Sequence, residues 1–138
     1  MMLMISILSA VLLSGCGGGS SNYNDGLTTL FLVDDEGSPY PYIPYICESM
    51  VDWGTTQDNG EFSFYPGEDC TFDFTGLYGT DPYDIYVDDF IYIVDDLDNG
   101  KNGIDYECLY FGVGSTYDDG IWDGSFDYDA NDRCVFYL

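Results

Sequence analysis

Residues 33–47 read VDDEGSPYPYIPYIC, and residues 94–108 read VDDLDNGKNGIDYEC. The two stretches align without a gap, from a shared Val-Asp-Asp to a shared Ile-x-Tyr-x-Cys. Each copy continues through Thr-x-Asp-x-Gly-x-aromatic, starting at Thr56 and Thr116, and closes on Cys-x-Phe, starting at Cys70 and Cys134. A pattern of this length does not recur by chance, so the chain is interpreted as two copies of one unit.

The second half of this alignment runs from Thr56 and Thr116 to the closing cysteines, and the second copy is longer there. It pairs Gly60 with Gly120 and Phe62 with Trp122, and it places the extra residues of the second copy after Trp122. The turn Asp58-Asn59-Gly60 has residues that tolerate a positive φ, and Asp118-Asp119-Gly120 is interpreted as its counterpart.

Short β-branched and aromatic runs, separated by Gly, Pro, Asn and Asp, predict strands throughout, and no stretch has a useful amphipathic helical period. Because side chains alternate across a strand, the cysteines are expected to point inward with the apolar residues. The predicted fold class is all-β. The expected strands are 30–33, 42–48, 61–65 and 70–74 in the first copy, and 85–87, 90–94, 104–111, 120–126 and 133–138 in the second.

Composition and charge restrict the partners. Of the 138 residues, 46% are hydrophobic and 18% are aromatic, which is enough apolar surface for a folded core. Asp and Glu number 26, against Lys101 and Arg133 alone, so the net charge is -24. A charge of this sign repels phosphate backbones, and nucleic acid is excluded as a partner.

The N-terminal segment predicts export. Residues 1–14 are uncharged and apolar, but shorter than the roughly twenty residues that a membrane-spanning helix needs, which indicates a signal peptide. Leu13-Ser14-Gly15-Cys16 resembles the lipobox of bacterial lipoproteins, and this resemblance implies cleavage after residue 15 and lipidation of Cys16. Two or more acyl chains would anchor the protein stably to a membrane. An ordinary signal peptide with an incidental cysteine is the alternative.

The chain is therefore divided into five parts. A signal peptide (1–15) precedes a Gly- and Ser-rich flexible tether (16–26). Two β-sandwich modules (27–77 and 85–138) follow, separated by a linker (78–84) with Gly and Pro punctuation.

The remaining cysteines predict disulfides. With Cys16 assigned to lipid, four cysteines are left, and an even number in an exported chain favours disulfide bonds. Pairing Cys47 with Cys70, and Cys108 with Cys134, treats both copies alike. Each bridge closes a loop of about twenty-five residues and contributes about 3 kcal/mol. Zinc is not expected, because the chain has no His and no Cys-x-x-Cys pair.

The first copy resembles a known class of module. Residues 33–39, 43–47 and 56–64 resemble the carboxypeptidase regulatory-like modules and the related B-type repeats of bacterial surface adhesins. The resemblance covers residues 27–74 and, more weakly, residues 85–138. It implies an Ig-like, prealbumin-like β-sandwich that acts as a stalk, spacer or binding module.

Acidic residues around the second turn suggest a calcium site. Residues 96–107 do not fit the register of an EF-hand loop, because Gly100 falls at a ligand position. Calcium also accepts looser sets of carboxylates and carbonyls. The candidate ligands are Asp95, Asp96, Asp98 and Asp105, and the alternative is a solvated acidic turn.

Catalysis is not expected. The chain has no His to act as a base, and 26 acidic residues make some carboxylate pairs inevitable. The aromatic run Tyr40, Tyr42 and Tyr45 is a better lead, either as a surface for glycans or proteins or as part of the core.

The sequence thus predicts a non-catalytic lipoprotein of the bacterial outer membrane or cell surface, anchored through its N-terminal lipid. Its role would be structural or adhesive, with a possible protein or glycan partner and no cofactor. A glycan- or calcium-binding surface module is the alternative function.

Overall fold

The computed structural model describes residues 26–80 and 88–138. The predicted signal peptide, the tether up to residue 25, Cys16, most of the linker and the expected strand 85–87 lie outside the described residues. Within the described ranges, no helix is long and apolar enough to cross a membrane.

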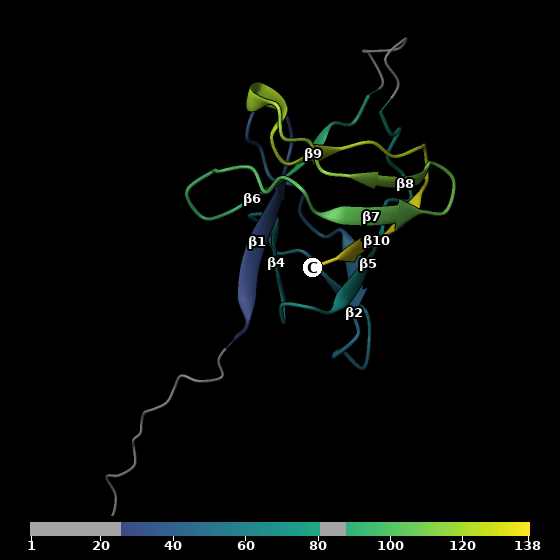
Figure 1. Cartoon of the computed structure of the whole chain (residues 1–138). Helices are drawn as coiled ribbons and strands as arrows, with labels where there is room; N and C mark the ends of the chain where they lie inside the picture. Colours follow the sequence, from purple (N-terminus) through teal and green to yellow (C-terminus); the bar gives the residue numbers. More distant parts are fainter. Residues whose placement is uncertain (1–25, 81–87) are drawn as a thin grey trace, which may run out of the picture.

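Two sheets lie face to face, with β1 and β4 on one side of the molecule and β2, β5 and β10 on the other (Figure 1). The all-β prediction is confirmed. The four-stranded sheet has the order β4 (Glu61–Phe64), β1 (Thr28–Val33), β6 (Ile91–Val94) and β9 (Ser125–Phe126). The six-stranded sheet has the order β3 (Gly54–Thr55), β2 (Pro44–Cys47), β5 (Asp69–Asp73), β10 (Arg133–Tyr137), β7 (Asp105–Cys108) and β8 (Gly112–Ser115).

Most predicted strands are found, with shifted ends. The short edge strands β3 and β8 were not predicted, and both pair only with the strand beside them. The predicted strand 120–126 is wrong in its first part, where the 3-10 turn η2 (Gly120–Trp122) precedes the two-residue strand β9. The predicted strand 104–111 is also too long, because β7 ends at Cys108 and Tyr110 is exposed.

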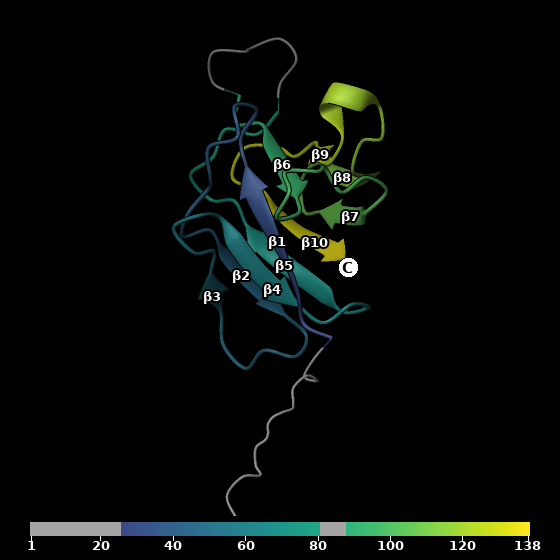
Figure 2. The ribbon, with the colours of Figure 1, turned by 90° about the vertical axis from the view of Figure 1, so that its left-hand side faces the viewer.

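The two copies of the repeat do not form separate bodies. Strand β1 of the first copy pairs with β6 of the second, and β5 pairs with β10, so both sheets contain strands of both copies (Figure 2). The expectation of two tandem modules is therefore not confirmed. One sandwich encloses one core, because neither copy has enough strands to cover its own apolar face.

Each strand of the first copy has a counterpart in the second: β1 and β6, β2 and β7, β3 and β8, β4 and β9, β5 and β10. When every strand is replaced by its counterpart, the order of each sheet is the same read from the opposite end. The equivalent residues Leu32 and Ile93 pair directly across β1 and β6, and Thr71 pairs with Val135 across β5 and β10. An approximate two-fold axis therefore passes between these pairs. The repeat behaves as an intramolecular dimer of two half-sandwiches.

The core draws equally on the two copies. Its buried residues from the first copy are Leu30, Leu32, Cys47, Phe62, Phe64, Cys70, Phe72 and Phe74, and those from the second are Ile91, Ile93, Tyr106, Cys108, Phe126, Tyr128, Cys134 and Phe136. Aromatic rings cross the boundary between the copies. The Phe72 and Phe136 ring centroids are 5.7 Å apart, and those of Phe74 and Tyr128 are 5.0 Å apart. Such ring pairs add to the free energy of apolar burial.

The threonine of the repeat has a structural role. Thr56 is fully buried, and its hydroxyl donates to the carbonyl of Tyr40 (2.7 Å) and accepts from the amide of Ile43 (2.9 Å). Thr116 repeats both bonds with Lys101 and Ile104 at the same distances. A buried hydroxyl must be hydrogen-bonded. The loop around each threonine provides one acceptor and one donor for it, which explains why both copies have threonine at this position.

The structure corrects the sequence alignment beyond Thr116. Gly60 and Gly124 have φ angles of +84° and +85°. A Cβ added to Gly60 would lie 2.3 Å from the carbonyl oxygen of Leu32, and one added to Gly124 would lie 2.5 Å from the carbonyl oxygen of Ile93. Gly124, not Gly120, is thus the counterpart of Gly60, and Phe126, not Trp122, is that of Phe62. The extra residues of the second copy include Trp122 and do not follow it.

Candidate functional site

The four predicted cysteines form the two predicted disulfides, Cys47–Cys70 and Cys108–Cys134. Each pair faces across adjacent antiparallel strands, β2 with β5 and β7 with β10. All four cysteines are buried. The bridges therefore fasten strands within the six-stranded sheet, close loops of 23 and 26 residues, and each contributes about 3 kcal/mol in the chain-entropy model.

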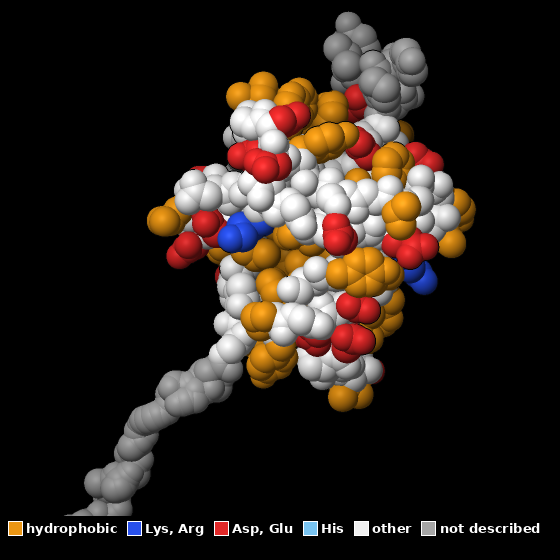
Figure 3. Space-filling view, viewed as in Figure 1, with side chains coloured by type: hydrophobic (Ala, Val, Ile, Leu, Met, Phe, Trp, Pro, Cys, Tyr) orange, Lys and Arg blue, Asp and Glu red, His pale blue; other side chains and the backbone are white. Residues whose placement is uncertain are grey.

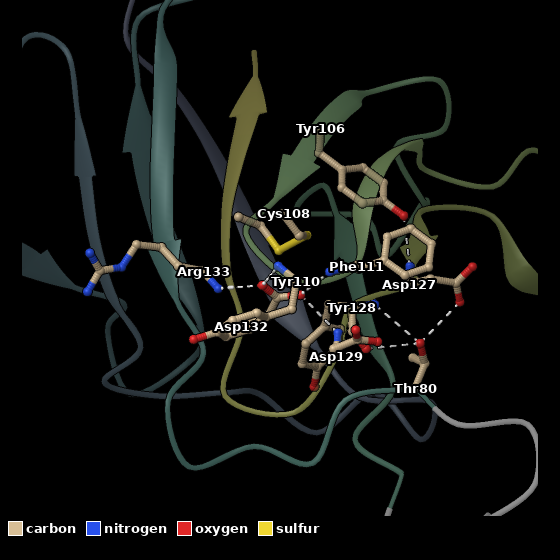
Figure 4. The surroundings of a disulfide bond; sticks show 11 residues. Thr80, Tyr106, Cys108, Tyr110, Phe111, Asp127, Tyr128, Asp129, Asp132 and Arg133 are labelled. Atoms are coloured by element: carbon tan, nitrogen blue, oxygen red, sulfur yellow. Dashed lines mark hydrogen bonds between the residues drawn. A yellow bond between two sulfur atoms is a disulfide. The ribbon is translucent and has the colours of Figure 1, made fainter.

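A buried carboxylate lies beside each disulfide. Asp132 is completely buried and accepts four backbone N–H groups (Figure 4): Tyr110 (2.8 Å) and Arg133 (2.9 Å) on Oδ1, and Phe111 and Asp129 (both 3.0 Å) on Oδ2. These four N–H donors supply the hydrogen bonds that a buried carboxylate requires. Asp132 thus holds the loop after Cys108 against the loop before Cys134.

Glu68 occupies the equivalent position in the first copy. Its carboxylate accepts the amides of Ser49 (2.8 Å) and Tyr65 (2.6 Å) and the hydroxyl of Ser49 (3.2 Å). In the described residues, three potential metal ligands come within 4.8 Å of one another only at these two places, Glu68 with Cys47 and Cys70, and Asp132 with Cys108 and Cys134. The cysteines are bonded to each other and the carboxylates are occupied by hydrogen bonds, so both groups are structural.

Glu68 should make the protein sensitive to acid. Burial alone would raise the pKa of this carboxyl, but the hydrogen bonds from Tyr65 and Ser49 outweigh it and lower the pKa below its usual value. A depressed folded-state pKa gives stability that is fully present above the unfolded pKa of about 4.3 and is lost as pH falls through the folded pKa. We expect Glu68→Gln to lower the free energy of unfolding by about 1–2 kcal/mol at pH 7, and by less as the pH falls below 4.

Denaturant unfolding from pH 7 to pH 3 measures this effect. Glu36→Gln, which removes a carboxylate from an exposed turn, is the control for the change in net charge. A stability difference between wild type and Glu68→Gln that stays constant down to pH 3 would contradict the assigned role.

The candidate calcium ligands are not gathered at one point. Asp95 uses its carboxylate in its own turn, where Oδ1 accepts the amides of Leu97 and Asn99 at 2.9 Å each. Asp34 closes the corresponding turn of the first copy in the same way. Asp105 lies on β7 and accepts the hydroxyl of Ser115. Together with Asp96 and Asp98, these residues do not form a cluster of three ligands among the described residues.

Asp98 instead lines a hollow between the two copies. The hollow has a volume of about 490 Å³ and is also lined by Asp34, Asp35 and Asp123. No three of these carboxylates lie within 4.8 Å of one another in the described structure. The hollow is a concentration of negative charge with no defined coordination geometry.

The tyrosines of the first repeat divide between core and surface. Tyr45 packs on the core with its ring 5.3 Å from that of Phe72, which confirms the preferred interpretation. Tyr40 also packs against the core, and its hydroxyl donates to the carbonyl of Phe90 (3.0 Å). Only Tyr42 is exposed, at a φ of +62° where the second copy has Gly103 at +72°.

Within the described residues, the loop that contains η2 departs from the two-fold symmetry. In the first copy the chain from Gln57 to Glu61 forms a tight turn. The amide of Gln57 donates to the carbonyl of Glu61 (3.0 Å), and the amide of Gly60 donates to the carbonyl of Gln57 (2.9 Å). The second copy makes the equivalent bonds from Tyr117 to Ser125 (2.9 Å) and from Gly124 to Tyr117 (3.0 Å). Four additional residues are therefore accommodated between the same two anchor points.

These additional residues form one wall of a pocket of about 290 Å³. The pocket is lined by Thr80, Phe90, Tyr117, Asp119, Trp122, Ser125, Phe126 and Asp127. The Phe90 and Trp122 rings are 6.1 Å apart and inclined at 52°, so they form an open corner. Hydrophobic side chains gather at this end of the molecule, with acidic side chains beside them (Figure 3).

Asp127 is hydrogen-bonded to two other residues of the pocket lining, Tyr117 and Thr80. Its carboxylate accepts the hydroxyls of Tyr117 and of Thr80, the latter at 3.2 Å. The hydrogen bond to Asp127 is the main cause that raises the pKa of Tyr117 to about 12, so Tyr117 stays neutral at physiological pH. The pocket therefore combines neutral aromatic walls with two carboxylates.

Sequence reasoning missed both the buried carboxylates and this pocket. An acidic residue stands two positions before the closing cysteine of each copy, which was a usable signal for Glu68 and Asp132. The pocket had a weaker signal, since Trp122 was aligned with a core position and its loop was predicted as a strand. Its lining comes from segments as distant as Thr80 and Asp127, and only folding brings them together.

The chain was compared with models of known protein families, with curated proteins and with solved structures, and no match was found. The resemblance to carboxypeptidase regulatory-like modules and adhesin repeats therefore stays a prediction. The structure supports its coarse part, an Ig-like all-β sandwich with two disulfides.

Proposed function

We propose that the protein is an exported lipoprotein, anchored through Cys16 to the bacterial outer membrane or cell surface, whose sandwich acts as a non-catalytic adhesive or structural element. The observation that supports this most is the pair of buried disulfides. Structural disulfides persist in oxidising compartments and are rare in the cytosol. Lipid attachment and location are expectations from the lipobox resemblance.

A non-catalytic role is supported by the chemistry of the buried acids. Glu68 and Asp132 are fully engaged with backbone amides, so neither is available as a general acid or base. The chain also contains no imidazole. The net charge of -24 repels nucleic acid and leaves proteins and small molecules as candidate partners.

The arrangement of the molecule is suited to presentation at a surface. The described part begins at Gly26, at the opposite end of the sandwich from the loop that contains η2 (Figures 1 and 2). A membrane anchor that precedes Gly26 would direct the exposed aromatic end away from the membrane. Ile121 is 83% exposed and Trp122 is 41% exposed, which favours a binding role over that of a simple spacer.

Lipid anchoring is tested by Cys16→Ser. The variant is expected to lose incorporation of radioactive palmitate and to move from the membrane fraction to the soluble fraction, while Ser20→Ala keeps both properties. Unchanged labelling and membrane association of Cys16→Ser would overturn the proposal of anchoring through this residue.

The glycan- or calcium-binding alternative has its own test. A saturable rise of the melting temperature with calcium, absent with magnesium, would favour a metal-binding module. Binding of glycans to the exposed aromatic residues would favour a lectin-like module.

A further inference from the structure

At the equivalent turn of the first copy a hollow is lined by Gln57, Asp58, Asn59 and Glu61 and by no aromatic residue, whereas the pocket beside η2 has aromatic walls. Its η2 wall is the four-residue addition to a turn that the first copy closes with the same backbone hydrogen bonds and fewer residues. The addition is therefore not needed to complete the sandwich. It places Trp122 in solvent at 41% exposure, whereas its neighbour in the fold, Phe126, is 1% exposed and fills the core.

The free surface of the pocket is aromatic. Phe90 and Trp122 form the corner described above, and Tyr117, which is 40% exposed, lies in the same lining. The electron-rich faces of Trp and Tyr attract organic cations, and this attraction is stronger where water is partly excluded. A cavity of about 290 Å³ has room for a small ligand group.

The charge of the pocket is negative and unbalanced. Its lining includes two carboxylates, Asp119 and Asp127, and neither Lys nor Arg. Asp119 precedes η2 without capping it by a side-chain hydrogen bond, so its carboxylate has no structural task at the start of the turn. The net charge of the whole chain, -24, has the same sign and raises the local concentration of cations.

The neutral polar groups of the pocket are already used. Ser125 donates its hydroxyl to the carbonyl of Trp122 (2.7 Å), and the Thr80 and Tyr117 hydroxyls bond to Asp127. A sugar needs several free donors and acceptors in fixed positions, and these groups do not supply them. A metal ion needs more oxygen ligands than two carboxylates on aromatic walls provide.

We propose that Phe90, Tyr117 and Trp122, with Asp119 and Asp127, form a binding site for a small organic cation of the quaternary ammonium type. The aromatic faces surround the alkyl groups of the cation, and the carboxylates balance its charge. Anchoring at Cys16 is not required for this site, because every residue that builds it belongs to the described sandwich.

Trp122 offers a direct readout. The chain has two tryptophans, and Trp53 lies in the first copy, where Arg133 stacks over its ring at 5.5 Å. In a Trp53→Phe background, purified in an uncharged polyoxyethylene detergent, all tryptophan fluorescence comes from Trp122. Choline is added at constant ionic strength, and its uncharged carbon isostere is added in parallel.

The expected result is a saturable fluorescence change with choline and at least tenfold weaker binding of the isostere. Asp119→Asn should weaken choline binding at least fivefold, while Asp58→Asn, the same charge change in the first copy's turn, should not. Equal binding of choline and isostere, or no saturable change, would overturn the proposal. Tighter binding of a methyl glycoside than of choline would overturn it in favour of a glycan site.

A loop exchange gives a second test of the pocket, which does not depend on whether the variants with single substitutions fold. Replacing residues 117–125 by the first copy's Gln-Asp-Asn-Gly-Glu retains the backbone closure and removes Tyr117, Asp119 and Trp122. We expect a folded protein by circular dichroism that shows no choline binding by calorimetry. Retained choline binding in the folded variant would overturn the assignment to this pocket.

Discussion

Residues 27–80 and residues 88–138, each expressed alone under oxidising conditions, are expected to remain unfolded as monomers. Separation would leave β1 without β6 and β5 without β10, which exposes two inner strand edges. It would also uncover Phe72 and Phe74, which contact Phe136, Phe126 and Tyr128 of the other copy. Each half would keep one two-stranded sheet, which is marginally stable at best on its own, and one three-stranded sheet whose apolar face is no longer fully covered.

Amide NMR spectra of the two half-chains measure this directly. Each alone should give poorly dispersed resonances, whereas co-expression of both halves should restore the dispersed spectrum of the intact chain. The intact chain should unfold in one transition, because both copies share one core. A monomeric half-chain with dispersed resonances and a cooperative melt would contradict the single-sandwich interpretation and restore the tandem-module prediction.

Asp132→Asn is expected to be the most destabilising single change of a polar residue discussed for this protein. The asparagine keeps one carbonyl oxygen, so two of the four backbone N–H donors face an NH₂ group instead of an acceptor. An unsatisfied buried donor costs about 1–3 kcal/mol, and we expect a total loss of about 4 kcal/mol.

Urea unfolding at pH 7 measures the loss, with Asp129→Asn as the matched control. Asp129 is exposed and loses the same single charge, so its substitution should change the free energy of unfolding by less than about 0.5 kcal/mol. Hydrogen exchange adds a local readout, because the amides of Tyr110 and Phe111 should lose protection first. Equal stabilities of the two variants would show that Asp132 does not hold these loops.

Several features were predictable because they depend on local chemistry. Alternation of apolar residues and turn residues gave the strands around Leu30, Phe62, Phe72 and Ile93. The cysteine pairing was predictable because one arrangement alone closes a bridge within each copy of the repeat. The burial of Tyr45 followed from its position between Ile43 and Cys47 on one strand face.

Other features could not be predicted because they depend on contacts between distant segments. The edge strands β3 and β8 contain Gly and few apolar residues, and they form only because β2 and β7 offer a free edge. The alignment failed at Trp122, because a four-residue addition moved an aromatic residue into the register of Phe62. The candidate calcium ligand Asp105 was separated from Asp95 because β7 carries it into the other sheet.

The sequence alone determined that this protein is an all-β chain of two related copies with one disulfide in each, since these properties follow from residue types and their spacing. Only the tertiary structure decided that the copies share one sandwich, because the partners of β1 and β5 are set by the strand edges and apolar faces that each copy leaves uncovered. The same packing decided where four of the acids lie: Glu68 and Asp132 beside the disulfides, bound by backbone amides, and Asp119 and Asp127 in the lining of the aromatic pocket.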